Sequence, residues 1–149
     1  FIPKLIMNLK LFLNKKIPTI VGLDHISYRI NPIDRWFNFY FEAKERGLDP
    51  LWTINHGWIS GIYYKDPDGN LVEIFFEHFS SAEEFKSNIS PDFEDEPIGT
   101  NMDVEVLYEM YKAGSDFSEL ITKGNTVPEG KKPVSGFDAV VNMKKKFKD

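Results

Sequence analysis

The chain has no cysteine, and this absence limits its chemistry at once. It can form no disulfide bond and no thiolate metal site, so histidine, aspartate and glutamate remain as the strong metal-binding side chains. Only three histidines are available, His25, His56 and His78. A chain without cysteine suits a reducing compartment, and we expect a cytoplasmic protein.

An excess of positive charge and long hydrophobic runs are also missing. The sequence has 18 basic and 23 acidic residues, a formal net charge of -5. Nucleic acid and anionic membranes normally bind a basic surface, so we expect neither as a partner. The apolar start, residues 1–13, is interrupted by Lys4, Asn8 and Lys10. It falls far short of the roughly 20 residues that span a bilayer, and we predict a strand there.

The composition is typical of a globular domain: 42% of the 149 residues are hydrophobic and 15% are aromatic. Polar and apolar residues alternate over 25–30, which predicts a half-buried strand. Asn31-Pro32 predicts the start of a helix over about 32–46, with Asn31 as its cap. Three short apolar runs, 51–54, 58–64 and 71–76, predict strands, and the turn residues 66–70 make the last two an antiparallel hairpin.

The order strand, helix and three strands is complete by about residue 78. It predicts an α+β fold with one βαβββ module and a helical C-terminal extension. We expect four segments: a residual N-terminal strand and linker (1–21), the module (22–80), the helical extension (81–122), in which 82–86 and 102–113 are helical, and a polar, solvated tail (123–149).

Glu73 is the most anomalous residue, because it lies inside the apolar run 71–76. An ionised carboxylate there needs a partner or a metal. His25 occupies the polar face of the first strand, and a curved sheet can bring it to the same concave face as Glu73. His78 follows Glu73 by five positions, so alternation places it on the opposite face, outside the site. The simpler interpretation of a single strand histidine is a surface or satisfied core residue, and that of a single strand glutamate is exposure to solvent.

Two further residues have suitable chemistry. His56 lies in the loop before the strand 58–64, an exposed place suited to an imidazole that transfers protons. Tyr63 has a phenol with an ordinary pKa near 10, so at neutral pH it can donate a hydrogen bond to a phenolate or carbonyl oxygen. A solvated loop histidine and a packing tyrosine are the alternatives.

Three stretches together resemble a known pattern: 22–26 (GLDHI), 55–57 (NHG), and 63–73 (YYKDPDGNLVE). They are similar to the vicinal oxygen chelate superfamily of glyoxalases, bleomycin-resistance proteins and extradiol dioxygenases. The His-Gly pair and the tyrosine are most like the ring-cleaving dioxygenases that act on catechol and on biphenyl-2,3-diol. The resemblance covers roughly residues 22 to 122.

The resemblance implies a non-haem Fe(II) site that uses a 2-His-1-carboxylate triad. His25 and Glu73 would be two of its ligands, and a small aromatic diol and dioxygen would be the substrates. His56 would be the acid/base, and Tyr63 would hydrogen-bond the catecholate oxygen.

Trp52 and Trp58 could line a pocket for a planar ring, with core packing as the alternative for each.

The sequence departs from the family in its N-terminal part. The family builds its cup from two βαβββ modules, and the third ligand comes from the first of them, which is largely missing here. Asn8, a poor iron ligand, stands where that histidine is expected. Three interpretations stay open: a dioxygenase completed by a partner subunit in a homodimer or higher oligomer, a metal-free dimer that sequesters an aromatic ligand, or an inactive truncated relative that has lost its metal.

Overall fold

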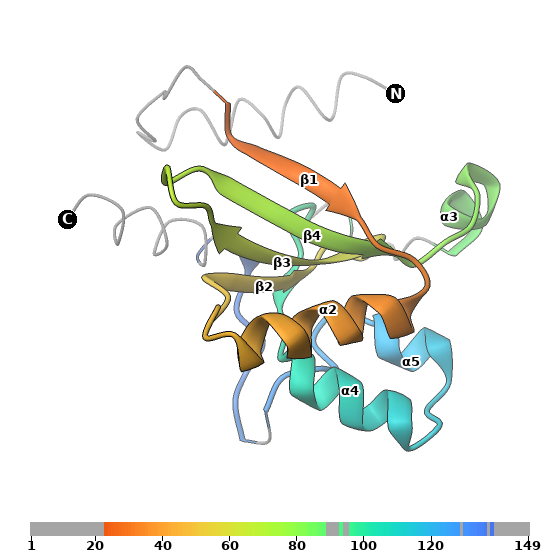
Figure 1. Cartoon of the computed structure of the whole chain (residues 1–149). Helices are drawn as coiled ribbons and strands as arrows, with labels where there is room; N and C mark the ends of the chain where they lie inside the picture. Colours follow the sequence, from red (N-terminus) through yellow and green to blue (C-terminus); the bar gives the residue numbers. More distant parts are fainter. Residues whose placement is uncertain (1–22, 89–92, 94–95, 129, 137, 139–149) are drawn as a thin grey trace.

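The computed structural model describes residues 23–88, 93, 96–128, 130–136 and 138. They form an α+β fold in which helices lie against one face of a mixed five-stranded sheet (Figure 1). The predicted N-terminal strand, Asn8 and the end of the polar tail lie outside the described residues.

The elements follow one another in the order that the sequence predicts as far as β4. They are β1 (His25–Arg29), α2 (Ile33–Glu45), β2 (Trp52–Asn55), β3 (Ile59–Lys65), β4 (Leu71–Glu77), α3 (Ala82–Asn88), β5 (Thr100–Asn101), α4 (Val104–Lys112) and α5 (Phe117–Ile121). The first five are compatible with a single βαβββ module. The short β5 and α5 were not predicted.

The strand order in the sheet is β1-β4-β3-β2-β5. β1 runs parallel to β4, while the other pairs are antiparallel. The β3–β4 hairpin turns at residues 66–70, where Asp66 accepts hydrogen bonds from the backbone and side chain of Asn70 and Gly69 adopts a φ of 89°. The first and last strands of the module are therefore neighbours, although helix and hairpin separate them in the sequence.

The hydrophobic core lies between the sheet and helices α2 and α4. α2 contributes the fully buried Trp36 and Phe37, which pack with Ile62 and Phe76 on the sheet. The Trp36 indole Nε1 donates a hydrogen bond to the Ile74 carbonyl oxygen at 3.0 Å. Because Ile74 and Phe76 face the helices, the alternate residues of β4 face the other side of the sheet.

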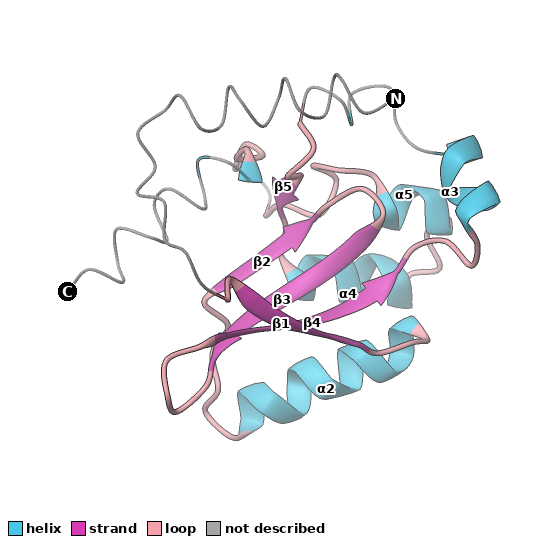
Figure 2. Ribbon diagram, turned by 90° about the horizontal axis from the view of Figure 1, so that it is seen from above, coloured by secondary structure: helices cyan, strands magenta, loops and turns pink. Residues whose placement is uncertain are grey.

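Two local expectations are wrong. Asn31 does not cap α2: the N-cap residue is Pro32, and the Asn31 side-chain oxygen instead accepts a hydrogen bond from the Glu77 backbone. The apolar face of β1 is not half-buried, since Ile26 is 40% and Tyr28 56% exposed. β1 is an edge strand of the sheet (Figure 1), whereas α2, drawn alongside the sheet in Figure 2, contacts β4 most among the strands.

The first part of the predicted solvated tail packs against the domain. Thr126 is buried, and its carbonyl oxygen accepts a hydrogen bond from the Asp103 backbone at 2.6 Å. Ser135 forms a β-bridge with Thr100 beside β5. Glycine, proline and lysine give this stretch no hydrophobic periodicity, so composition alone did not predict these backbone contacts.

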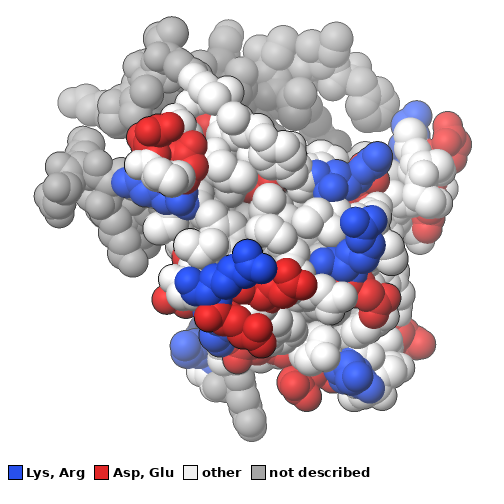
Figure 3. Space-filling view, viewed as in Figure 1, with Lys and Arg blue, Asp and Glu red and all other residues white. Residues whose placement is uncertain are grey.

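Acidic and basic side chains are interspersed on the face shown in Figure 3, without a patch of one sign. No helix in the part of the chain that the structure describes has the length and hydrophobicity to cross a membrane.

His78 is buried on the helix side of the sheet, as alternation from Glu73 predicts. Its Nε2 lies 2.8 Å from the Ser60 hydroxyl, and its ring packs against Phe76. Burial lowers the pKa of His78 from 6.5 to about 3, because the charged imidazolium loses its hydration. The native protein therefore holds His78 neutral.

This burial predicts a pH-dependent stability. Below pH 6.5 the unfolded chain protonates His78 and the native state does not, so stability falls as the pH drops from 6.5 toward 3. Between pH 7 and pH 5 the loss from His78 should be about 2 kcal/mol. Urea unfolding at both pH values should show a smaller loss for His78→Gln than for the wild type. Equal losses would contradict this prediction.

Candidate functional site

One row of side chains crosses the sheet on the face away from α2. Ser27 on β1 lies opposite Glu73 on β4, Glu73 opposite Tyr63 on β3, and Tyr63 opposite Trp52 on β2. Residues that face each other in neighbouring strands project to the same side. The strand order thus brings together residues from four separate parts of the sequence.

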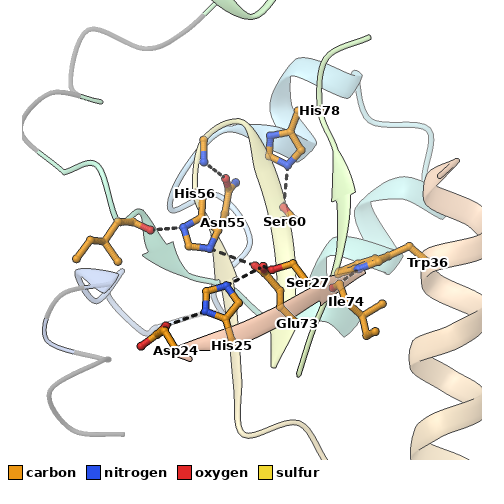
Figure 4. Close-up of polar contacts among 12 residues, drawn as sticks. Asp24, His25, Ser27, Trp36, Asn55, His56, Ser60, Glu73, Ile74 and His78 are labelled. Atoms are coloured by element: carbon orange, nitrogen blue, oxygen red, sulfur yellow. Dashed lines mark hydrogen bonds and ion pairs between the residues drawn. The ribbon is translucent and has the colours of Figure 1, made fainter. Parts of the chain in front are cut away.

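Glu73 is the centre of this row, and its side chain is only 3% exposed. Ser27 donates a hydrogen bond to its Oε2 at 2.6 Å, and His25 Nε2 lies 3.4 Å from the same oxygen. His56 Nε2 lies 3.6 Å from the other oxygen, Oε1 (Figure 4). The structure brings His25 and Glu73 to the same face, as the sequence suggested, and it also places His56 beside them.

Glu73 is ionised at neutral pH. Burial raises the pKa of its carboxyl group, but favourable interactions with His56, Ser27 and Tyr63 outweigh burial and lower that pKa below its ordinary value. Its Oε1 is buried and accepts no hydrogen bond from the described residues. A buried carboxylate oxygen without a donor is costly unless another positive group satisfies it.

Asp24 orients the His25 ring. The His25 Nδ1 lies 2.7 Å from the Asp24 carboxylate, which can only accept a hydrogen bond, so Nδ1 carries a hydrogen. With Nδ1 bonded to Asp24, the ring points its Nε2 toward Glu73. A carboxylate that fixes the far nitrogen is the usual arrangement around metal-bound histidines. The sequence did not single out Asp24, because an acidic residue at the start of a strand usually faces solvent.

A backbone carbonyl orients His56 in the same way. Its Nδ1 lies 2.6 Å from the Ile98 carbonyl oxygen, so Nε2 faces Glu73. Gly99 allows this approach: it has a φ of 98°, and a Cβ there would overlap the Asn55 carbonyl group. The expectation of an exposed loop histidine is wrong, since the His56 side chain is 16% exposed. The sequence could not predict the role of Ile98, because its contact with His56 uses a backbone carbonyl oxygen, which every residue has.

Aromatic rings border the carboxylate. Tyr63 is 5% exposed; its ring centroid lies 5.3 Å from that of His25 and 5.1 Å from that of Trp52. Burial raises the pKa of Tyr63, and the nearby negative charge of Glu73 raises it further, so its phenol stays neutral. Trp58 is 43% exposed and its ring packs near Phe85 on α3, apart from this cluster.

The spacing of His25 and Glu73 suits a shared cation. When two ligand atoms each lie about 2.1 Å from one ion and the ligand–ion–ligand angle is a right angle, the two ligand atoms are about 3 Å apart. The distance between His25 Nε2 and Glu73 Oε2 is 3.4 Å, which is close to this value. Without a metal, the two lone pairs face each other unless a proton lies between them. Within the described residues, however, no group of three or more His, Cys, Asp or Glu side chains could hold a metal. The described residues thus offer two donors.

Comparison with known proteins gives two curated relatives, both from Rhodococcus globerulus. Biphenyl-2,3-diol 1,2-dioxygenase 3 is 31% identical over 112 residues, which cover 74% of this chain and 59% of that protein. Biphenyl-2,3-diol 1,2-dioxygenase 2 is 28% identical over 106 residues, which cover 70% of this chain and 56% of that protein. No family model and no solved structure matches.

The matched segment spans less than two thirds of the length of either relative. Over most of its own length, this chain is therefore related to dioxygenases named for an aromatic diol.

Proposed function

We propose that the chain belongs to the vicinal oxygen chelate superfamily and acts as an Fe(II)-dependent extradiol dioxygenase on a catechol-type diol. Its similarity to the two biphenyl-2,3-diol dioxygenases supports this reaction class. The observation that carries it is the convergence of two imidazole Nε2 atoms on the buried Glu73 carboxylate, at 3.4 and 3.6 Å. A buried carboxylate beside two imidazole nitrogens is stabilised by a positive charge, and a metal cation can provide it.

In this proposal His25 and Glu73 hold the iron. Their nitrogen and oxygen atoms are donors of the type found in non-haem iron oxygenases. Fe(II), when bound, supplies open coordination positions and Lewis acidity toward a catechol and dioxygen. The third donor comes from outside the described residues, and we propose a homodimer or higher oligomer as its source.

The neighbouring side chains bind the diol and move its protons. The neutral phenol of Tyr63 donates a hydrogen bond to a catecholate oxygen, and Trp52, packed against Tyr63, offers an apolar wall for the ring. His56 is anchored through Nδ1, which leaves Nε2 to accept a proton from the diol and return it later. Because Tyr63 and Glu73 are buried, water competes little at these atoms.

The wild-type chain tests the proposal. It should bind Fe(II) stoichiometrically under anaerobic conditions, as measured by elemental analysis after gel filtration. After addition of air it should convert catechol or biphenyl-2,3-diol to a yellow ring-cleaved product. The mass in solution, measured on the same sample, should exceed that of a monomer. Failure of both metal binding and product formation would reject the proposal.

A second candidate is a metal-free module that sequesters an aromatic ligand. The two-donor set of the described residues favours it, because a dependable iron site has three donors. The two candidates differ in their response to a chelator. Catechol binding followed by Trp fluorescence should weaken with EDTA if iron holds the ligand, and should stay unchanged if the aromatic walls alone hold it.

A further inference from the structure

We infer that Ser27 and Gly61 are positioning residues that aim the Glu73 carboxylate at its ligand position. The inference rests on the proposed function, because it assigns the direction of Glu73 to metal binding. The sequence did not indicate a role for either residue. Ser27 is one polar residue of an alternating strand, and Gly61 is a glycine within a strand. Both act on the same carboxylate from opposite sides.

Ser27 fixes Glu73 from the β1 side. Its hydroxyl donates a hydrogen bond to Oε2 at 2.6 Å, a short distance typical of a hydroxyl on an ionised carboxylate. The parallel register places the two residues directly opposite each other. This bond holds one oxygen, while Oε1 accepts no hydrogen bond from the described residues. A carboxylate oxygen has two lone pairs, so Oε2 can accept the bond from Ser27 and still offer a lone pair to a cation shared with His25.

Gly61 makes room for Glu73 on the β3 side. A Cβ at position 61 would overlap Glu73 Oε1 and lie 3.2 Å from the carboxylate carbon. The φ of Gly61 is not positive, so an alanine would fit its backbone. Position 61 therefore requires glycine because the Glu73 carboxylate occupies the space of a Cβ, and not because of the backbone conformation. Any side chain here would push the carboxylate away from the position between His25 and His56.

The neighbouring residue provides a matched control. Ser60 precedes Gly61 on β3 and points to the opposite face, where its hydroxyl lies 2.8 Å from His78 Nε2. Ser60→Ala removes a buried hydroxyl contact of similar length without touching Glu73. It therefore reports the general cost of losing such a contact in this sheet.

The first measurement is Fe(II) affinity by anaerobic calorimetry. Removing partners of metal ligands typically weakens metal binding about 10–100-fold. We expect losses of that size for Ser27→Ala and Gly61→Ala, and wild-type affinity for Ser60→Ala. Ser27→Thr, which keeps the hydroxyl, should restore most of the affinity. Wild-type affinity in Ser27→Ala and Gly61→Ala would overturn the inference, as would an equal loss in Ser60→Ala.

The second measurement needs no metal and separates this inference from the proposed function. Crystal structures of the metal-free proteins should show Glu73 displaced in Gly61→Ala and in more than one rotamer in Ser27→Ala, with one rotamer in the wild type and in Ser27→Thr. An unchanged Glu73 in both variants would overturn the positioning role. A wild type that binds no Fe(II) would reject the proposed function, and the rotamers would still decide whether Ser27 and Gly61 aim the carboxylate.

Discussion

Replacing Glu73 by glutamine is expected to weaken Fe(II) binding by at least about 100-fold, beyond the 10–100-fold typical of residues that only support a ligand. The substitution keeps the shape of the side chain and the hydrogen bond from Ser27, but removes the negative charge. A neutral amide oxygen is a weak iron donor, and His25 would remain as the only strong one among the described residues. Anaerobic calorimetry with Fe(II) gives the affinity, and ring-cleavage activity should fall with it.

Glu77→Gln is the matched control for Glu73→Gln. Glu77 lies on the same strand and the same face, four residues further on, and pairs with Arg29 at 3.0 Å. It also loses one negative charge, so it corrects for the overall electrostatic change. Wild-type affinity is expected for this variant. Similar losses in both variants would mean that Glu73 is not a ligand.

Replacing Trp36 by alanine is expected to lower the free energy of unfolding by about 3–5 kcal/mol. Trp36 has no exposed surface, packs edge-on against Phe37 and Phe76, and donates its indole hydrogen to the Ile74 carbonyl. The substitution leaves a cavity and removes the donor from that carbonyl. A loss of this size is a large part of the 5–15 kcal/mol typical of a domain.

Urea unfolding followed by far-UV circular dichroism measures this loss. Trp58→Ala is the control, because Trp58 is 43% exposed and its ring lies near that of Phe85, outside the buried core. Its cost should stay below about 1 kcal/mol, as for most surface substitutions. If both variants lost the same free energy, Trp36 would not be the centre of the core.

The strands and the helix of the module could be predicted because each carries a local signal: alternation in β1, helical spacing in α2 and a short apolar run in each of β2, β3 and β4. The four aromatic residues at 36, 37, 40 and 41 recur at helical spacing, and α2 covers Ile33–Glu45. β5 could not be predicted in this way. It has two residues, Thr100 and Asn101, and exists through its pairing with Asn55 and Ile54. A strand this short carries no period of its own.

The site was predictable where side chains carry the chemistry. An acidic residue in an apolar strand and a histidine in the first strand pointed to Glu73 and His25. Their orienting groups were not predictable, because each depends on a contact in space. The Ile98 carbonyl that contacts His56 is a backbone group, which the residue type does not indicate. Gly61 acts by leaving space for the Glu73 carboxylate, and only the structure shows that the carboxylate lies there.

The parallel pairing of β1 with β4 also determines when the cluster can form during folding. Ser27 and Glu73 are 46 positions apart, so the chain must close a long loop before they meet. A nascent chain that has not yet added β4 lacks the buried carboxylate altogether. If the cluster binds iron as proposed, an intermediate without β4 would lack the Glu73 ligand, and metal capture would follow the docking of the last module strand.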